Sequence, residues 1–260
     1  MSIFETSNLH LRYQLEGRAD APYLVLSNAL GAGLDMWAPQ MPSLLEHFRI
    51  LRYDARGHGQ SGVPPGPYTI AQMGGDVLAL MESLNIKRAH FCGLSMGGMV
   101  GMWLAAKHPE RIDRLVLCNT GARVGTNELW ETRIETVNKG GMEAVVPAVI
   151  SRWFTADFMA RVPAKVDLVR RMLLQMPAAG YAAGCAAIRD ADLRELVRNV
   201  VAPTLVIAGM RDKSTPPQDS KLVAERIPGA LYAELKTAHL SNWEAPQSFV
   251  TKVIAFLAPR

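Results

Sequence analysis

A serine flanked by glycines is the residue of this chain best placed to do chemistry. Ser95 lies in Gly93-Leu94-Ser95-Met96-Gly97, the G-x-S-x-G spacing in which a serine occupies a sharp turn between a strand and a helix. Such a turn strains the serine backbone and crowds the residues two positions away, where only glycine leaves room. The apolar stretch 88–94 and the helix-forming stretch 99–106 flank it. We therefore predict that Ser95 is a nucleophile raised above the edge of a sheet.

A serine hydroxyl is a weak nucleophile at neutral pH, so it needs a base and a carboxylate that orients the base. In this arrangement the acid and then the histidine follow the serine, each in a loop after a strand. Asp212 follows the apolar run 202–209, and His239 follows the run 230–235. Because parallel strands end at one edge of a sheet, we expect both side chains on the same side as Ser95. A loop-capping Asx turn is the alternative role for Asp212.

His58 is the only other histidine in a glycine-rich loop after a predicted strand. It precedes Ser95 in the chain, which is the wrong order for this arrangement. We therefore prefer His239 as the base.

Two backbone N–H groups are needed to stabilise the oxyanion that forms when Ser95 attacks a carbonyl. Met96 supplies one, because the turn places its N–H at the positive end of the following helix. We choose Leu30 for the second, because it lies in the small-residue loop that follows the predicted strand 23–27. The alternative is an ordinary tight turn built on Gly31 and Gly33.

Predicted strands and helices alternate through most of the chain. The predicted strands are 9–15, 23–27, 49–53, 88–94, 115–119, 202–209 and 230–235. The predicted helices are 37–48, 70–84, 99–106, 217–227 and 246–257. Several strands are continuous apolar runs, which is typical of strands covered on both faces. The alternation predicts an α/β fold with a mostly parallel central sheet and helices on both faces.

Between residues 123 and 198 the strand-like runs disappear, and helical periodicity interrupted by prolines takes over. We expect this segment to be an inserted all-helical cap, or lid, over the sheet. Residues 1–122 and 199–260 then form the core.

Composition excludes several classes of function. The 28 Lys and Arg residues against 24 Asp and Glu residues include no basic block, so we predict no nucleic-acid partner. No apolar run is long enough to span a membrane, and the N-terminus lacks a leader pattern. Cys92, Cys118 and Cys185 show neither disulfide nor metal spacing, which favours a cytoplasmic location. Without a dinucleotide-binding or metal-binding motif, we predict no cofactor and no metal.

The sequence resembles the α/β-hydrolase superfamily over essentially its whole length. The resemblance rests on the glycine-flanked Ser95, on the loop Tyr-Asp-Ala-Arg-Gly-His-Gly-Gln-Ser at 53–61, and on the late Asp212 and His239. Most members have His-Gly where this chain has Asn28-Ala29. The resulting Ser-Asn-x-Leu-Gly loop, together with the stretches 143–158 and 181–194, is similar to the 3-oxoadipate enol-lactonases of the β-ketoadipate pathway.

That resemblance implies hydrolysis of an enol-lactone to 3-oxoadipate during the degradation of aromatic compounds. The substrate is a small anionic lactone, and an arginine of the cap could hold its carboxylate in a bidentate manner. Arg133 is the first candidate, with Arg152 and Arg189 behind it, and Trp153 could wall the apolar side of the pocket. For each arginine, a solvated face or a surface ion pair is the alternative.

Two other functions remain open at this point. The chain could be a carboxylesterase or a hydrolase of carbon–carbon bonds in ring-cleavage products. It could also be a small-molecule receptor with slow hydrolysis, since some proteins of this fold act in that way.

Overall fold

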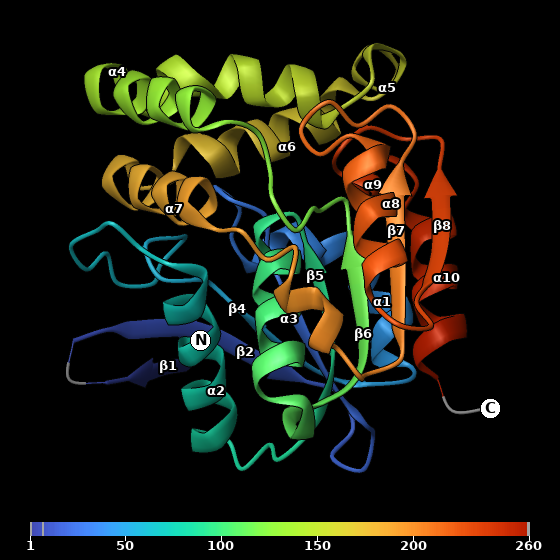
Figure 1. Cartoon of the computed structure of the whole chain (residues 1–260). Coiled ribbons are helices and arrows are strands. Elements are labelled where there is room, and N and C mark those ends of the chain that lie inside the picture. Colours follow the sequence, from blue (N-terminus) through green and yellow to red (C-terminus); the bar gives the residue numbers. More distant parts are fainter. Residues whose placement is uncertain (1, 7, 259–260) are drawn as a thin grey trace.

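The computed structural model describes residues 2–6 and 8–258. Its centre is an eight-stranded sheet with the strand order β1-β2-β4-β3-β5-β6-β7-β8 (Figure 1). The strands are β1 (Ser2–Glu5), β2 (His10–Glu16), β3 (Tyr23–Ser27), β4 (Arg49–Tyr53), β5 (Ala89–Leu94), β6 (Ile112–Cys118), β7 (Thr204–Gly209) and β8 (Leu231–Leu235). The pairs β1–β2 and β2–β4 are antiparallel, and every pair from β4 to β8 is parallel. The predicted mostly parallel sheet is confirmed.

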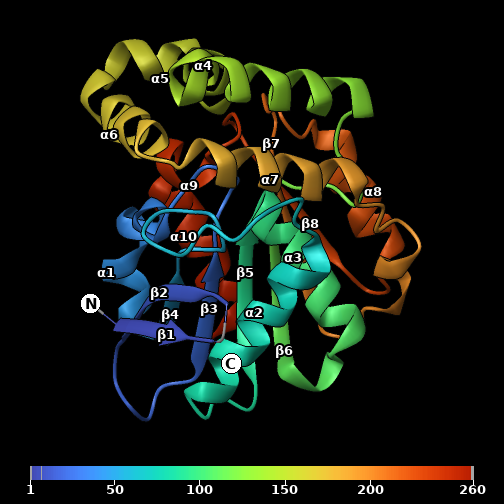
Figure 2. The same ribbon diagram turned by 90° about the vertical axis from the view of Figure 1, so that its left-hand side faces the viewer.

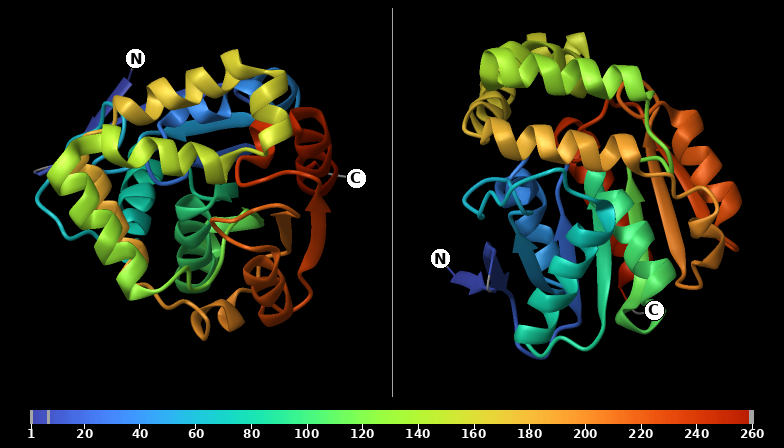
Figure 3. Two further views of the ribbon diagram at one scale, coloured as in Figure 1. Left: turned by 90° about the horizontal axis from the view of Figure 1, so that it is seen from above. Right: turned by 60° about the vertical axis from the view of Figure 1, so that its left-hand side comes forward.

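Helices cover both faces of the sheet, as predicted. They are α1 (Met41–Leu45), α2 (Ile70–Ser83), α3 (Met96–Lys107), α8 (Pro217–Arg226) and α10 (Pro246–Leu257), with the short α9 (Ser241–Glu244) and the 3₁₀ helices η1 (Leu34–Gln40) and η2 (Pro109–Arg111). α2, α3 and α8 lie on one face, and α1 and α10 lie on the other (Figure 3).

The prediction of one continuous helix over residues 37–48 is wrong. Residues 34–40 make the 3₁₀ helix η1, with Pro39 inside it, and α1 follows with Pro42 in its first turn. A proline lacks the N–H that an α-helix interior needs, so the segment divides into two short helices.

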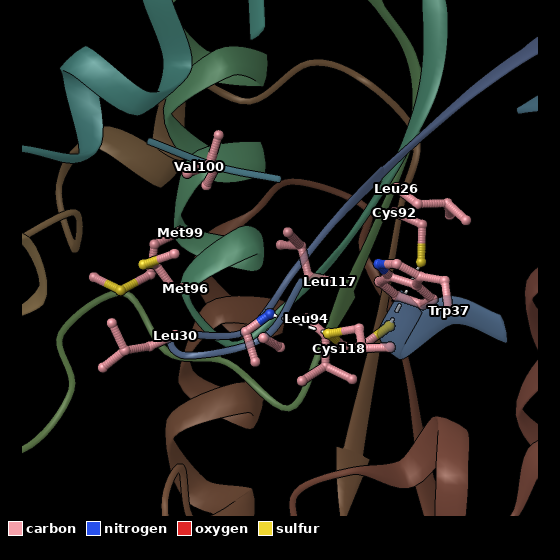
Figure 4. Packing of buried hydrophobic residues seen from close by; sticks show 14 of the residues in the cluster. Leu26, Leu30, Trp37, Cys92, Leu94, Met96, Met99, Val100, Leu117 and Cys118 are labelled. Carbon is pink, nitrogen blue, oxygen red and sulfur yellow. Dashed lines mark hydrogen bonds between the residues drawn. The ribbon is translucent and has the colours of Figure 1, made fainter. Parts of the chain in front are cut away.

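The central strands are held by apolar side chains packed on both faces. All residues of β5 and β7 are buried, as expected for parallel strands sandwiched between helices. Figure 4 shows Leu26, Leu94 and Leu117 close to Cys92 and Cys118 near the end of β5. The two free thiols lie 3.9 Å apart on neighbouring strands. Each such leucine contributes about 2 kcal/mol of burial free energy, so the carboxyl end of β5 is a rigid base for the residues that follow it.

Four α-helices lie between β6 and β7: α4 (Asn127–Trp153), α5 (Ala156–Arg161), α6 (Pro163–Leu174) and α7 (Ala178–Asp190). We refer to them as the cap helices. They lie over the carboxyl ends of the parallel strands (Figures 1 and 2). α4 packs against α6 and α7, and it bends at Gly141, where φ is 63°. The 3₁₀ helix η3 (Leu196–Asn199), which overlaps the end of the range expected for the cap, contacts α3 and α8 of the core instead.

In the part of the chain that the structure describes, no helix has both the length and the apolar character needed to cross a membrane.

Candidate active site

Ser95 occupies a strained turn between β5 and α3. Its φ of 57° and ψ of −117° lie in a region of backbone conformation where residues other than glycine are rarely found. A Cβ atom on Gly97 would lie 2.3 Å from the backbone oxygen of Ser27, and one on Gly93 would lie 2.1 Å from the backbone oxygen of Gly97. The two glycines therefore let α3 approach β3 and β5 closely, and this approach is what lifts Ser95 to the sheet edge.

The turn is also held from the neighbouring strand β6. The Ser95 N–H donates to the backbone oxygen of Cys118 at 2.9 Å. The Thr120 hydroxyl donates to the Ser95 backbone oxygen at 2.7 Å. With both backbone groups bonded, the side chain of Ser95 is left facing the space beneath the cap helices, where it lines a cavity.

The structure brings Asp212 and His239 together. They follow β7 and β8, respectively, and His239 Nδ1 lies 2.8 Å from Asp212 Oδ2. Both side chains are almost completely buried. His239 lines the same cavity as Ser95.

The Asp212 carboxylate has four further donors. Oδ1 accepts from the N–H groups of Ser214 at 2.8 Å and Thr215 at 3.0 Å. Oδ2 accepts from the Thr215 hydroxyl at 2.8 Å and from Asn119 Nδ2 at 3.1 Å. Burial alone would raise the pKa of Asp212, but the charge of His239 and these hydrogen bonds outweigh it and lower the pKa below its ordinary value. An ionised Asp212 accepts a hydrogen bond from the Nδ1–H group of His239, which leaves Nε2 as the basic nitrogen of the imidazole.

Asn119 and Thr215 were missed by sequence reasoning. Thr215 lies three residues after Asp212, a spacing typical of a hydroxyl that bonds a nearby loop carboxylate. Asn119 directly follows β6 and has a φ of 46°. A polar residue at the end of a buried strand was the only sequence feature that pointed to it.

Leu30 and Met96, the residues predicted to supply the two N–H groups for the oxyanion, line the same cavity as Ser95. Within residues 2–6 and 8–258, neither the Leu30 N–H nor the Met96 N–H donates a hydrogen bond, and both residues line the cavity. Asn28 fixes the loop before Leu30, because its side chain donates to the Tyr53 backbone oxygen at 2.8 Å and its backbone oxygen accepts from Gly97 at 3.0 Å. Unpaired N–H groups held in this way could stabilise an oxyanion without reorganisation.

The cavity has a volume of about 410 Å³ and lies between the sheet edge and the cap helices. Of the four predicted substrate-binding residues, Arg133, Arg152 and Trp153 line it. The Trp153 ring packs beside the His239 imidazole with centroids 5.9 Å apart. The Arg133 guanidinium stacks on the ring of Trp130 at 4.8 Å.

Arg133 and Arg152 both lack a carboxylate partner within 4.0 Å among the described residues. Burial and the nearby charge of Arg133 lower the pKa of Arg152. Two neighbouring cations without a counter-ion in a partly enclosed cavity are suited to binding an anion.

Arg189 is the predicted residue that the structure does not bring to this site. Its guanidinium pairs with the adjacent Asp190 at 2.7 Å, and it lies outside the cavity lining. It sits near the end of α7, where its side chain is 25% exposed, while the preceding Ile188 lines the cavity.

The lining also includes polar and aromatic residues that were not predicted, among them Trp130, Tyr181, Lys213 and Asp219. Burial raises the pKa of Tyr181 far above its ordinary value. Burial also raises the pKa of Asp219, and the charge of Asp212 adds to this effect. The cavity is therefore cationic at the cap helices and of mixed charge near α8.

No three His, Cys, Asp or Glu side chains gather as a metal site requires within the described ranges. That the protein requires neither a metal nor a cofactor stays a prediction.

Comparisons with known proteins agree with this fold. Residues 22–145 match the family described as alpha/beta hydrolase fold, and a relative covering 92% of the chain is 40% identical to it. The chain therefore belongs to the alpha/beta hydrolase family, and it is a hydrolase by class.

That 40% identical relative is 3-oxoadipate enol-lactonase 2 of Acinetobacter baylyi, of which 90% is covered. The crystal structure of the enol-lactonase from Burkholderia xenovorans LB400 is 46% identical, with a TM-score of 0.97 over 98% of this chain and 99% of that one. A thermophilic esterase from Thermogutta terrifontis, solved with malate bound, is 27% identical, with a TM-score of 0.92 over 99% of this chain and 98% of that one.

Proposed function

We propose that this protein opens the lactone ring of 3-oxoadipate enol-lactone to give 3-oxoadipate, with Ser95, Asp212 and His239 as a catalytic triad. One observation carries the proposal: the cavity that holds Ser95 and His239 also presents Arg133 and Arg152, which have no carboxylate partner within 4.0 Å in the described part of the chain. A lactone with a free carboxylate matches that combination of nucleophile and cations. The similarity to enol-lactonases supports the same substrate.

In the first half of the reaction, His239 Nε2 takes the proton of the Ser95 hydroxyl as Ser95 Oγ attacks the lactone carbonyl. The Leu30 and Met96 N–H groups stabilise the oxyanion. The ring carbon–oxygen bond then breaks, and the leaving oxygen is that of an enol. His239 returns its proton to this oxygen, and the enol, which is still part of the acyl group on Ser95, becomes the ketone. Because an enolate is a better leaving group than an alkoxide, this step demands less of His239 than ordinary ester cleavage.

In the second half, His239 takes a proton from a water molecule that attacks the acyl-enzyme carbonyl. The carbon–oxygen bond to Ser95 breaks, Ser95 recovers the proton from His239, and the new carboxylic acid loses its own proton to solvent to become the second carboxylate of the product. Asp212 stays ionised throughout and stabilises the imidazolium in both halves.

Arg133 and Arg152 bind the free carboxylate in this proposal, and Trp153 forms the apolar side of the pocket beside His239. The cap helices act as a lid that excludes bulk water from the acyl-enzyme. Arg189 has no part in binding, because Asp190 holds it outside the cavity. The cytoplasmic location stays a prediction from the cysteine content.

The test is a spectrophotometric assay of enol-lactone loss with the wild type, Ser95→Ala and Asp212→Asn. Ser95→Ala should abolish turnover with the fold intact. Asp212→Asn should lower kcat by about 10³- to 10⁴-fold, since the imidazole loses its orienting acceptor. Turnover of the lactone by Ser95→Ala would remove the proposed nucleophile.

A carboxylesterase acting on a small ester is the second candidate, and the 27% identical esterase favours it. The two functions separate on a substrate panel. Efficient hydrolysis of p-nitrophenyl acetate with no turnover of the enol-lactone would favour the esterase. A stable covalent adduct on Ser95 after a single burst would instead indicate a receptor.

A further inference from the structure

Glu244 on the short helix α9 joins the loop of His239 to the cap helices. Its Oε2 accepts a hydrogen bond from the Ala238 N–H at 2.8 Å, and Ala238 directly precedes His239. Its Oε1 accepts a hydrogen bond from the Thr155 hydroxyl. Thr155 is the N-cap residue of α5 and follows Phe154, the C-cap residue of α4. One carboxylate therefore bonds to both sides of the boundary between the core and the cap.

α9 is a fixed base for this carboxylate, because buried hydrogen bonds tie it to η1 on the core. The Gln40 side chain donates to the Asn242 backbone oxygen at 2.5 Å. The Asn242 amide and the Trp243 indole N–H both donate to the Met36 backbone oxygen, at 3.0 and 2.7 Å. Three donors in a buried environment hold α9 against the core. Glu244 thus extends from the rigid helix α9 toward the loop of His239 and toward the start of α5 in the cap.

Two more contacts join the same segments. The Leu240 N–H donates to the Trp153 backbone oxygen at 3.1 Å, and the Trp153 ring packs beside the His239 imidazole. In the chain, His239 therefore lies between Ala238, whose N–H donates to Glu244, and Leu240, whose N–H donates to Trp153 in the cap helices.

We propose that Glu244 is a positioning residue that places His239 relative to Ser95 and makes this placement depend on the seating of the cap. The proposal rests on the proposed roles of Ser95 and His239. Asp212 fixes the Nδ1 side of the imidazole, but the backbone of His239 needs its own restraint, and Glu244 supplies it through Ala238. Loss of that restraint leaves a buried N–H without an acceptor, and a shift of about 1 Å at a reacting group can cost about 100-fold in rate.

Two matched pairs of variants separate the restraint from simple packing. Glu244→Ala removes both hydrogen bonds, whereas Glu244→Gln can still accept from Ala238 and donate to the Thr155 oxygen. Thr155→Val removes the bond to the cap and the N-cap of α5, whereas Thr155→Ser keeps both. Thr69→Val is the control, because it removes the N-cap of α2 far from the cavity.

The readout is the rate at which a fluorophosphonate labels Ser95, because labelling needs His239 but not the natural substrate. The kcat and KM for p-nitrophenyl acetate and the thermal midpoint Tm are measured beside it. We expect Glu244→Ala to slow labelling and kcat about tenfold or more, with KM nearly unchanged. Glu244→Gln and Thr155→Ser should stay within about threefold of the wild type, and Thr155→Val should fall between. Thr69→Val should lower Tm alone.

Labelling of Glu244→Ala at the wild-type rate would overturn the proposal, as would an equal loss in Glu244→Gln with Tm unchanged. If Glu244→Ala does not fold, the comparison of Thr155→Val with Thr155→Ser decides, and equal rates in that pair reject the link to the cap. A wild type that no fluorophosphonate labels would reject the proposed function itself. A wild type that is labelled but ignores the enol-lactone would reject only the substrate.

Discussion

Asn119, at the end of β6, donates a hydrogen bond from its side-chain amide to Asp212 at the end of β7, with 3.1 Å between the two atoms. The same amide nitrogen also donates to the backbone oxygen of Ala238, at 3.2 Å. One side chain thus holds the acid and the loop of the base at once. The position of His239 is therefore set by three elements, which are the ends of β6 and β7 and the helix α9.

Asn119→Ala should lower kcat for the enol-lactone about tenfold and destabilise the protein by about 1 to 3 kcal/mol. The reason is that Asp212 loses a donor and the Ala238 oxygen is left buried with one partner fewer. Steady-state kinetics and urea unfolding measure the two effects. The control is Asn138→Ala on the exposed face of α4, which should leave kcat unchanged and should not destabilise the protein, because alanine is the better helix former. Wild-type kcat in Asn119→Ala would show that Thr215 and the loop N–H groups suffice for Asp212.

Arg133→Gln and Arg152→Gln should each raise KM for the anionic lactone about tenfold or more, because the substrate carboxylate loses a charge-assisted partner. The kcat/KM for p-nitrophenyl acetate, which carries no carboxylate, should change less than threefold. Arg189→Gln is the matched control, since this arginine pairs with Asp190 outside the cavity. If the lactone and the neutral ester lose equally, the arginines shape the cavity and do not bind the carboxylate.

Most of the sheet was predictable because its parallel strands are continuous apolar runs separated by turns or amphipathic helices. β1 was missed because its four residues are mostly exposed and carry no apolar run. α9 was missed because four residues are too few to show helical periodicity. In both cases tertiary contacts, and not local composition, stabilise the element.

The candidate site shows the same division. The positions of Ser95, Asp212 and His239 follow from local features, namely a glycine-flanked serine and polar residues just after buried strands. The contacts of Asn119 and Glu244 join residues 93 and 89 positions apart, and no spacing in the sequence encodes them. Arg189 was predicted to line the cavity and does not. Its position depends on the direction in which α7 presents each side chain, and the sequence alone does not give that direction.

His58 should make the stability of the protein fall as the pH is lowered from about 6.5 to about 4. Burial lowers its pKa from 6.5 to about 4, and its Nε2 is buried without a partner among the described residues. Below pH 6.5 the unfolded chain binds a proton at this residue and the folded protein does not, so protonation favours unfolding. From the two pKa values, the loss reaches about 3 kcal/mol near pH 4 and then levels off.

Urea unfolding at a series of pH values checks this effect, with His58→Gln as the comparison. Glutamine does not titrate, so the difference in unfolding free energy between variant and wild type should shift in favour of the variant as the pH falls. A difference that is constant from pH 7 to pH 4 would show that His58 titrates alike in the folded and unfolded states.

Gly97→Ala and Gly75→Ala should change stability in opposite directions. A Cβ on Gly97 would lie 2.3 Å from the Ser27 backbone oxygen, whereas one on Gly75 in α2 meets no atom within 4 Å. Gly97→Ala should therefore push α3 away from β3, at a cost of about 1 to 3 kcal/mol, and displace Ser95 enough to lower kcat about 100-fold. Gly75→Ala should raise stability by about 0.5 to 1 kcal/mol, because alanine loses less backbone entropy in a helix, and leave kcat unchanged. Equal stability and activity in Gly97→Ala would mean that the turn at Ser95 can relax without its close contact to β3.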